Sequence, residues 1–184
     1  KIRDAIPRHG RLEIYTVSDL DGSLLVPSVS LCNPGRGREI DPLTGNPKQV
    51  EDKWRSGFDG PISSAIEGLV EKSPLQSSEI LGSIQSITLT GLRTRERDNL
   101  THKLVIVSDL MQNTQDANFY KGIPKFKDFQ QTRAYQQSMA DLKGVDVEIW
   151  IISRNNLGQE TQLISLWGSI LRAQGATLSR IYRI

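Results

Sequence analysis

Three apolar segments in the second half of the chain constrain the fold most. Residues 103–110 (KLVIVSDL) and 145–153 (VDVEIWIIS) carry nearly unbroken apolar runs, and residues 178–184 (LSRIYRI) form a third β-like segment. An unbroken run of this length is typical of a strand that is buried on both faces, as in a parallel sheet. Helical patterns separate the three segments, at about 129–142 and 159–175. This alternation predicts a mostly parallel sheet covered by helices on both faces.

The first half of the chain predicts an antiparallel strand pair. Residues 11–17 (RLEIYTV) alternate with strand periodicity, and residues 23–32 (SLLVPSVSLC) form a second strand whose proline favours an edge position. Asp21 and Gly22 between them are a strong hairpin signal. Residues 33–57 are rich in glycine, proline and charge, and we expect a long loop there.

Two further helices are expected before residue 103. Pro61 suits the first position of a helix that extends to about Val70. Ser73-Pro74-Leu75-Gln76 has the pattern of a capping box and opens the next helix. We therefore predict an α/β fold with a three-layer, Rossmann-like, doubly wound sheet, mostly parallel with one antiparallel edge strand. All of residues 1–184 are expected to form a single domain, with the long loop 33–57 inside it.

Composition excludes several classes of protein. The chain has 37% hydrophobic and 24% charged residues, which is typical of a soluble globular domain, and its net charge of +2 is too small to argue for nucleic acid. Cys32 is the single cysteine, so no internal disulfide is possible. One cysteine and two histidines do not provide the spacing of a zinc site. No apolar run approaches the ~20 residues of a membrane span.

Ligands of a doubly wound sheet bind beyond the carboxyl ends of its strands. The loops expected at those ends are residues 18–21, 108–114 and 153–158. These loops are therefore the first places to look for binding or catalytic residues.

The first of these loops resembles a phosphatase motif. Asp19-Leu20-Asp21-Gly22-Ser23 follows a strand and is similar to the nucleophile loop of the haloacid-dehalogenase phosphatases. That resemblance implies a magnesium-dependent phosphoryl hydrolase that uses Asp19 and Asp21, with Asp109 as a metal ligand. A hairpin turn explains the same residues without catalysis, because aspartate and glycine supply its backbone angles. The hydrolase is kept as the alternative function.

The order of elements resembles the von Willebrand factor type A (vWA) domain. RLEIYTVSD and SLLVPSVSL look like its second and third strands, and FDGPISSAIEGL (58–69) stands at its G-G-T segment. HKLVIVSDLMQNT (102–114) is similar to its fourth strand and the loop that follows. The resemblance covers nearly the whole chain and implies a protein-interaction module of a larger assembly, not an enzyme. It also implies that the family's first strand lies upstream of Lys1.

Members of this family often bind a divalent metal in an adhesion site. The resemblance matches Asp109 to one ligand, and places Asp59 near the position of the family's threonine ligand. The D-x-S-x-S ligand loop would lie upstream of Lys1. We therefore expect a degenerate or partial site that holds no cofactor, or Mg²⁺ if upstream residues complete it.

The expected partner is another protein, bound through residues 18–21, 59–62 and 108–114. The candidate contact residues are Ser18, Asp19, Asp59, Ser108, Asp109 and Asn113.

Two other segments contain residues that can bind a partner. Residues 120–129 (YKGIPKFKDF) mix lysines and aromatic residues and are a weaker candidate for nucleic acid, since such aromatic residues more often pin a loop. Trp54, in the polar segment 33–57, is expected to pack that loop in preference to anchoring a partner.

Overall fold

The computed structural model divides the chain into two compact units. Lys1–Thr16 and Val26–Pro74 form the first unit, and Val17–Leu25 and Leu75–Ile184 form the second. The structure describes residues 2–17, 23–70, 78–92, 100–153 and 157–184. The assignment of residues 1–184 to one domain stays a prediction.

A short helix and a pair of strands begin the first unit. Helix α1 covers Ile2–Ala5, and strands β1 (Arg11–Ile14) and β2 (Val29–Cys32) pair antiparallel, with Arg11 opposite Cys32. The predicted antiparallel pair is confirmed. Both strands are shorter than predicted, and the segment between Ile14 and Val29 is much longer than a two-residue hairpin turn.

The predicted long loop 33–57 is wrong, because most of its second half is helical. Asn46 caps a helix there, since its side chain accepts a hydrogen bond from the Gln49 N–H at 3.1 Å, and Pro47 occupies the first helical position. The segment contains the 3₁₀ turn Gly37–Glu39 and helix α2 (Pro47–Trp54), which continues through the π-helical turn Arg55–Asp59 into α3 (Gly60–Val70). Asn46 and Pro47 are the signal that could have located α2.

The core of the first unit forms on one face of this continuous helical stretch. Trp54, Phe58 and Ile62 follow each other at intervals of four residues and are at most 4% exposed. The rings of Trp54 and Phe58 lie 6.1 Å apart. The partly buried residues that pack against them are Ile6, Leu12, Ile14 and Leu31. Apolar spacing along α2–α3 therefore determines which side of the helix meets the β1–β2 pair.

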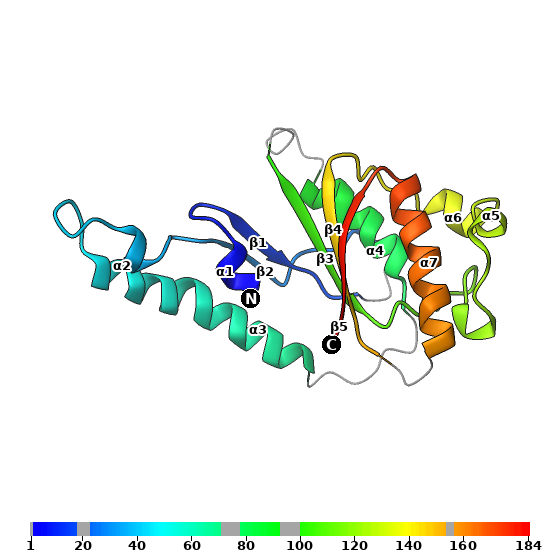
Figure 1. Ribbon diagram of the computed structural model, residues 1–184, viewed down its shortest axis with the longest axis horizontal. Helices are drawn as coiled ribbons and strands as arrows, with labels where there is room; N and C mark the ends of the chain where they lie inside the picture. The colour runs from blue at the N-terminus through cyan, green and yellow to red at the C-terminus, as the bar shows by residue number, and fades with distance from the viewer. Residues whose placement is uncertain (1, 18–22, 71–77, 93–99, 154–156) are drawn as a thin grey trace. The chain divides into compact units, whose positions relative to one another are not determined.

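The second unit contains a three-stranded parallel sheet (Figure 1). Its strands β3 (His102–Ser108), β4 (Val145–Ile151) and β5 (Thr177–Arg183) lie in the order β3-β4-β5. The predicted α/β class and the parallel direction of these strands are confirmed. The prediction that the antiparallel pair joins the same sheet is wrong, since β1 and β2 form a sheet of their own. A period of two identifies a strand but does not specify its sheet.

The helices of the second unit precede and connect these strands. They are α4 (Ile80–Ile87) with a π-helical turn at Thr88–Leu92, a 3₁₀ turn at Phe119–Lys121, α5 (Phe126–Phe129), α6 (Arg133–Gln137) and α7 (Leu157–Ala173). The single helix predicted at 129–142 is wrong, because the Thr132 side chain caps a new helix by accepting from the Tyr135 N–H. The capping box at Ser73–Gln76 lies outside the described residues. Gly175, with φ +91°, follows the end of α7 as predicted.

The apolar core of the second unit lies on one face of the sheet. From β4, Val145, Val147, Ile149 and Ile151 are at most 2% exposed and belong to one cluster with residues of α4, α5, α6 and α7. The alternate residues of β4 face the other way, because side chains of a strand alternate between faces. In the described part of this unit, the helices therefore pack against a single face of the sheet.

The opposite face carries a polar and aromatic cluster. Lys103 Nζ lies 2.6 Å from a Glu148 carboxylate oxygen, and Trp150 Nε1 donates to that carboxylate at 3.3 Å. Tyr182 meets Trp150 edge to face at 5.8 Å. Glu148 is only 7% exposed, so its charge is stabilised chiefly by these partners.

This cluster predicts a pH dependence of folding stability. The hydrogen bond from Lys103 outweighs burial and holds the pKa of Glu148 below its usual range, while the same bond raises the pKa of Lys103. A carboxyl whose pKa is lowered by folding contributes stability above its unfolded pKa, which is about 4.3, and loses it as the pH falls through the folded pKa. The lysine contribution is lost at high pH, above about 10.4.

Denaturant unfolding of the wild type and of Glu148→Gln, between about pH 3 and 7, measures this effect. We expect the free energy of unfolding of the wild type to decrease toward pH 3 more steeply than that of E148Q. An equally steep acid limb in both proteins would contradict the proposed role of the Lys103–Glu148 pair.

Candidate functional site

The loop that follows β3, residues 108–114, has a defined local structure. Ser108 Oγ accepts from the Leu110 N–H at 3.0 Å, and Asp109 Oδ1 accepts from the Met111 N–H at 3.0 Å. Leu110 adopts φ +63°, an unfavourable conformation for a residue with a branched side chain. The two side chains thus stabilise a sharp turn at the carboxyl end of the strand.

Buried contacts anchor this loop to two helices. Leu110 is fully buried, and its carbonyl accepts a hydrogen bond from Trp167 Nε1 of α7 at 2.9 Å. Gln112 is 3% exposed, and its side-chain oxygen accepts from the Leu81 N–H of α4 at 3.1 Å. These bonds offset the cost of the left-handed backbone at Leu110, so the loop is preorganised.

The candidate residues of the loop are partly accessible to solvent, although Leu110 and Gln112 anchor the loop to the helices. Ser108, Asp109 and Asn113 are each half-buried. The backbone of Asn113 exchanges two hydrogen bonds of 3.0 Å with Ser78. The structure therefore brings three of the six predicted contact residues together in one loop.

An ion pair lies at the carboxyl ends of β4 and β5. Glu160, in the first turn of α7, is 6% exposed and accepts from Ser153 Oγ at 2.7 Å. Its other oxygen accepts from Arg183 Nε, at the end of β5. The hydrogen bond from Ser153, followed by that from Arg183, lowers the pKa of Glu160. Sequence reasoning missed this cluster, although an acidic residue in the first turn of a helix is a recognisable signal.

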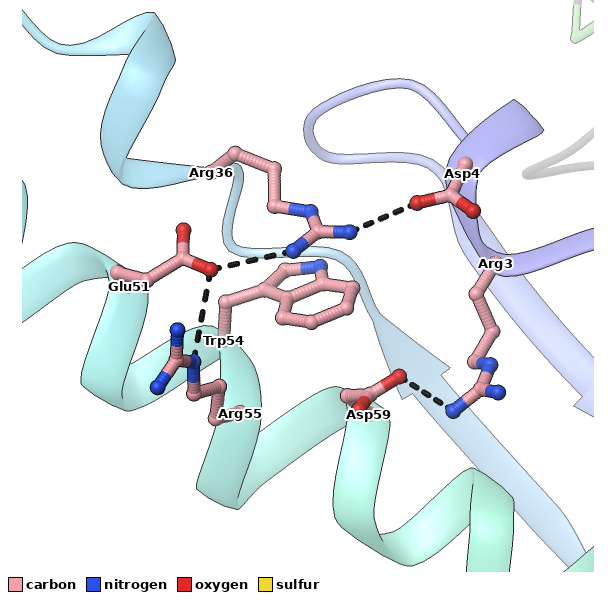
Figure 2. Close-up of a pocket in the computed structure, with 7 residues that line it drawn as sticks. All are labelled: Arg3, Asp4, Arg36, Glu51, Trp54, Arg55 and Asp59. Atoms are coloured by element: carbon pink, nitrogen blue, oxygen red, sulfur yellow. Dashed lines mark hydrogen bonds and ion pairs between the residues drawn. The ribbon is translucent and has the colours of Figure 1, made fainter. Parts of the chain in front are cut away.

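Asp59 belongs to the first unit, where it has a different environment. It forms an ion pair with Arg3, whose guanidinium also donates to Ser63 Oγ at 2.7 Å. Arg3 and Asp59 line an open pocket of about 380 Å³ (Figure 2). The remaining lining residues are Asp4, Arg36, Glu51, Trp54 and Arg55.

Arg36 occupies the centre of this pocket. Its guanidinium lies over the Trp54 ring, 3.3 Å from the ring centroid, and bridges Asp4 at 2.7 Å and Glu51 at 3.1 Å (Figure 2). Trp54 is 4% exposed and therefore packs within the unit, as predicted. The three arginines that line the pocket each pair with a carboxylate, so the pocket has no excess charge for an ionic ligand.

The remaining predicted residues lie outside the described part of the chain. They are Ser18 and Asp19 of the contact set, and Asp21 of the hydrolase alternative.

The described residues do not fit a self-sufficient Mg²⁺ site. Asp109 is the one carboxylate of the loop 108–114, and its Oδ1 already accepts from the backbone. Among the described residues, no group of three or more His, Cys, Asp or Glu side chains could hold a metal ion. A hard cation such as Mg²⁺ needs several convergent oxygen ligands. Neither Asp109 nor Asp59 is placed in such a set.

Two of the three aromatic residues of the basic segment 120–129 pin it to the core, whereas Tyr120 is 52% exposed. Phe129 meets the Phe119 ring at 5.5 Å, and Phe126 meets Tyr135 at 5.8 Å, both edge to face. These two rings are therefore not available for stacking on bases. The exposed lysines remain without an aromatic platform from these rings, which weakens the nucleic-acid hypothesis.

No family model, no curated protein and no solved structure matches the chain.

No helix within the described ranges is long and apolar enough to cross a membrane.

Proposed function

We propose that this chain is a protein-interaction module and not an enzyme, with its contact surface at the loop 108–114. The observation that carries the proposal is the preorganisation of this loop by Trp167 and Gln112. A rigid loop loses little conformational entropy on binding, which favours affinity. Asp109 is the charged group that this loop offers to a partner.

We also propose a vWA-type fold for the second unit. The parallel order β3-β4-β5, with helices between the strands, supports this, as does the polar loop after β3. The separate β1–β2 sheet argues against the resemblance in the first unit, because the family places those strands in the same sheet as β3. A three-layer arrangement would require a layer over the face that carries Lys103 and Trp150.

The hydrolase alternative is not favoured. Its nucleophile loop must lie between a strand and a helix, whereas residues 18–22 lie between β1 and β2, which pair antiparallel. We expect no hydrolysis of p-nitrophenyl phosphate by the chain in the presence of Mg²⁺. Turnover above the blank that disappears in Asp19→Asn would overturn the proposal.

Charge reversal at Asp109 tests the interaction surface. Proteins captured by the wild-type chain are compared with those captured by Asp109→Lys, and the dissociation constant of a purified candidate is then measured with both proteins. We expect at least about tenfold weaker binding by D109K, because like charges oppose a complementary interface. Asp109→Asn keeps the oxygen that accepts from the Met111 N–H, so weaker binding by D109N as well would assign the effect to the lost charge and not to the turn.

The matched control is Asp116→Lys, an exposed carboxylate eight residues beyond β3. It should bind within about twofold of the wild type, a change comparable to that of a neutral surface substitution. Thermal melting verifies that both variants are folded. A partner whose affinity is unchanged by D109K, or is lost equally in D116K, would refute the assignment of the surface.

A further inference from the structure

Strand β5 forms an exposed edge of the sheet in the described part of the second unit. It follows β4 in the order β3-β4-β5, and most of its residues are exposed on both faces. Ile181 is 38% exposed, Tyr182 39% and the following Ile184 61%. An edge of this kind presents a row of backbone donors and acceptors together with apolar side chains.

The direction of the backbone groups follows from one hydrogen bond. The Ile184 N–H donates to the Ile151 carbonyl at 3.0 Å, so Ile184 points its amide toward β4. Because amides alternate in direction along a strand, the amide of Tyr182 also points toward β4, whereas those of Ile181 and Arg183 point outward. These two outward amides are the donors that an added strand would use.

The side chains of β5 specify the chemistry of such a strand. Arg180 and Arg183 flank Ile181 and Tyr182, and no acidic residue occurs between Thr177 and Ile184. Arg183 pairs with Glu160 through Nε, but its side chain is 60% exposed, so its guanidinium stays accessible to an added strand. A second copy pairing antiparallel about the centre of this group would place Arg180 opposite Arg183 of the other copy, which is destabilising. The charges therefore favour an acidic segment from another protein.

We propose that the outer edge of β5 binds an extended segment of a partner protein by strand addition, and that this segment has the order acidic–apolar–apolar–acidic. The two acidic residues would lie opposite Arg180 and Arg183, and the two apolar residues opposite Ile181 and Tyr182. The order acidic–apolar–apolar–acidic reads the same from either end, so the segment can add parallel or antiparallel to β5. Main-chain hydrogen bonds supply affinity and side chains supply specificity in this mode. This surface is separate from the loop 108–114, and the inference does not depend on the function proposed for that loop.

A synthetic peptide tests the inference directly. The probe is acetyl-Ser-Thr-Glu-Val-Val-Glu-Thr-Ser-amide, and its control carries the same side chains with both valine nitrogens methylated. Titration calorimetry with the full chain should show at least about tenfold weaker binding of the methylated peptide, because in either direction of addition one valine N–H would donate to the edge, and its methyl group both removes that donor and holds the two backbones apart. Amide exchange followed by NMR should slow at Ile181 and Arg183 on binding, and remain unchanged at Tyr182.

Variants of β5 separate strand addition from simple charge attraction. We expect Arg180→Glu to weaken binding of the unmethylated peptide at least about tenfold, and Arg180→Lys to stay within about threefold. Ile181→Pro removes one outward donor and leaves the bonds to β4 in place, so it should abolish binding in a chain that circular dichroism shows to be folded.

Three outcomes would overturn the inference. The first is equal affinity for both peptides, which means that charge alone drives binding. The second is slowed amide exchange at the loop 108–114 in place of β5. The third is sedimentation that shows the chain dimerising through β5, with dimerisation lost in I181P.

Discussion

Replacing Trp167 with alanine is expected to lower the free energy of unfolding of the second unit by about 3–5 kcal/mol. Trp167 is fully buried and packs edge to face on Phe119, with ring centroids 6.3 Å apart. Its removal leaves a cavity in the core and removes one of the two donors to the buried Leu110 carbonyl, which keeps the Gln112 N–H at 3.1 Å. Denaturant unfolding measures the loss, and the candidate loop 108–114 should become more mobile in NMR relaxation.

Two variants distinguish the contributions of Trp167. Trp167→Phe fills much of the volume but has no N–H, so the lost hydrogen bond to the Leu110 carbonyl, which keeps the Gln112 N–H as a donor, should account for about 0.5–1.5 kcal/mol of its loss. Met139→Ala changes a side chain that is 52% exposed and should stay within about 0.5 kcal/mol. If W167F were as stable as the wild type, the hydrogen bond to Leu110 would not be what holds the loop.

Replacing Phe58 with alanine is expected to unfold the first unit. Phe58 is fully buried at the centre of a core that has only two other fully packed members among the described residues, Trp54 and Ile62. Truncation of a buried phenylalanine costs about 3–5 kcal/mol, and a core this small has little stability in reserve. Hydrogen exchange should show loss of protection in β1 and α2.

The second unit provides the internal reference for this experiment. Amides of β4 should keep their protection in Phe58→Ala, because their core belongs to a different cluster. Leu43→Ala, at a side chain that is 94% exposed, should leave both units protected. Equal loss of protection in β4 would show that the two units unfold as one.

The loop 108–114 could be located from the sequence, but its anchors could not. The rule that ligands bind at the carboxyl ends of parallel strands selected the loop, and the resemblance to the vWA family selected Ser108, Asp109 and Asn113 within it. Trp167 lies 57 residues from Leu110 in the chain, and no local pattern indicates that its indole N–H reaches that carbonyl. The Glu160–Arg183 pair was missed for the same reason, because it joins a helix start to a strand end.

The sequence by itself determined the strands β3, β4 and β5, their parallel direction and the end of α7. Each of these follows from local properties: unbroken apolar runs, helices of adequate length between them, and a glycine at the left-handed position after Ala173. Only the tertiary structure decided that β1 and β2 form their own sheet and that the described helices of the second unit share the core on one sheet face. Strand and helix patterns are set by neighbours in the chain, whereas the choice of sheet and face depends on contacts between residues far apart in it.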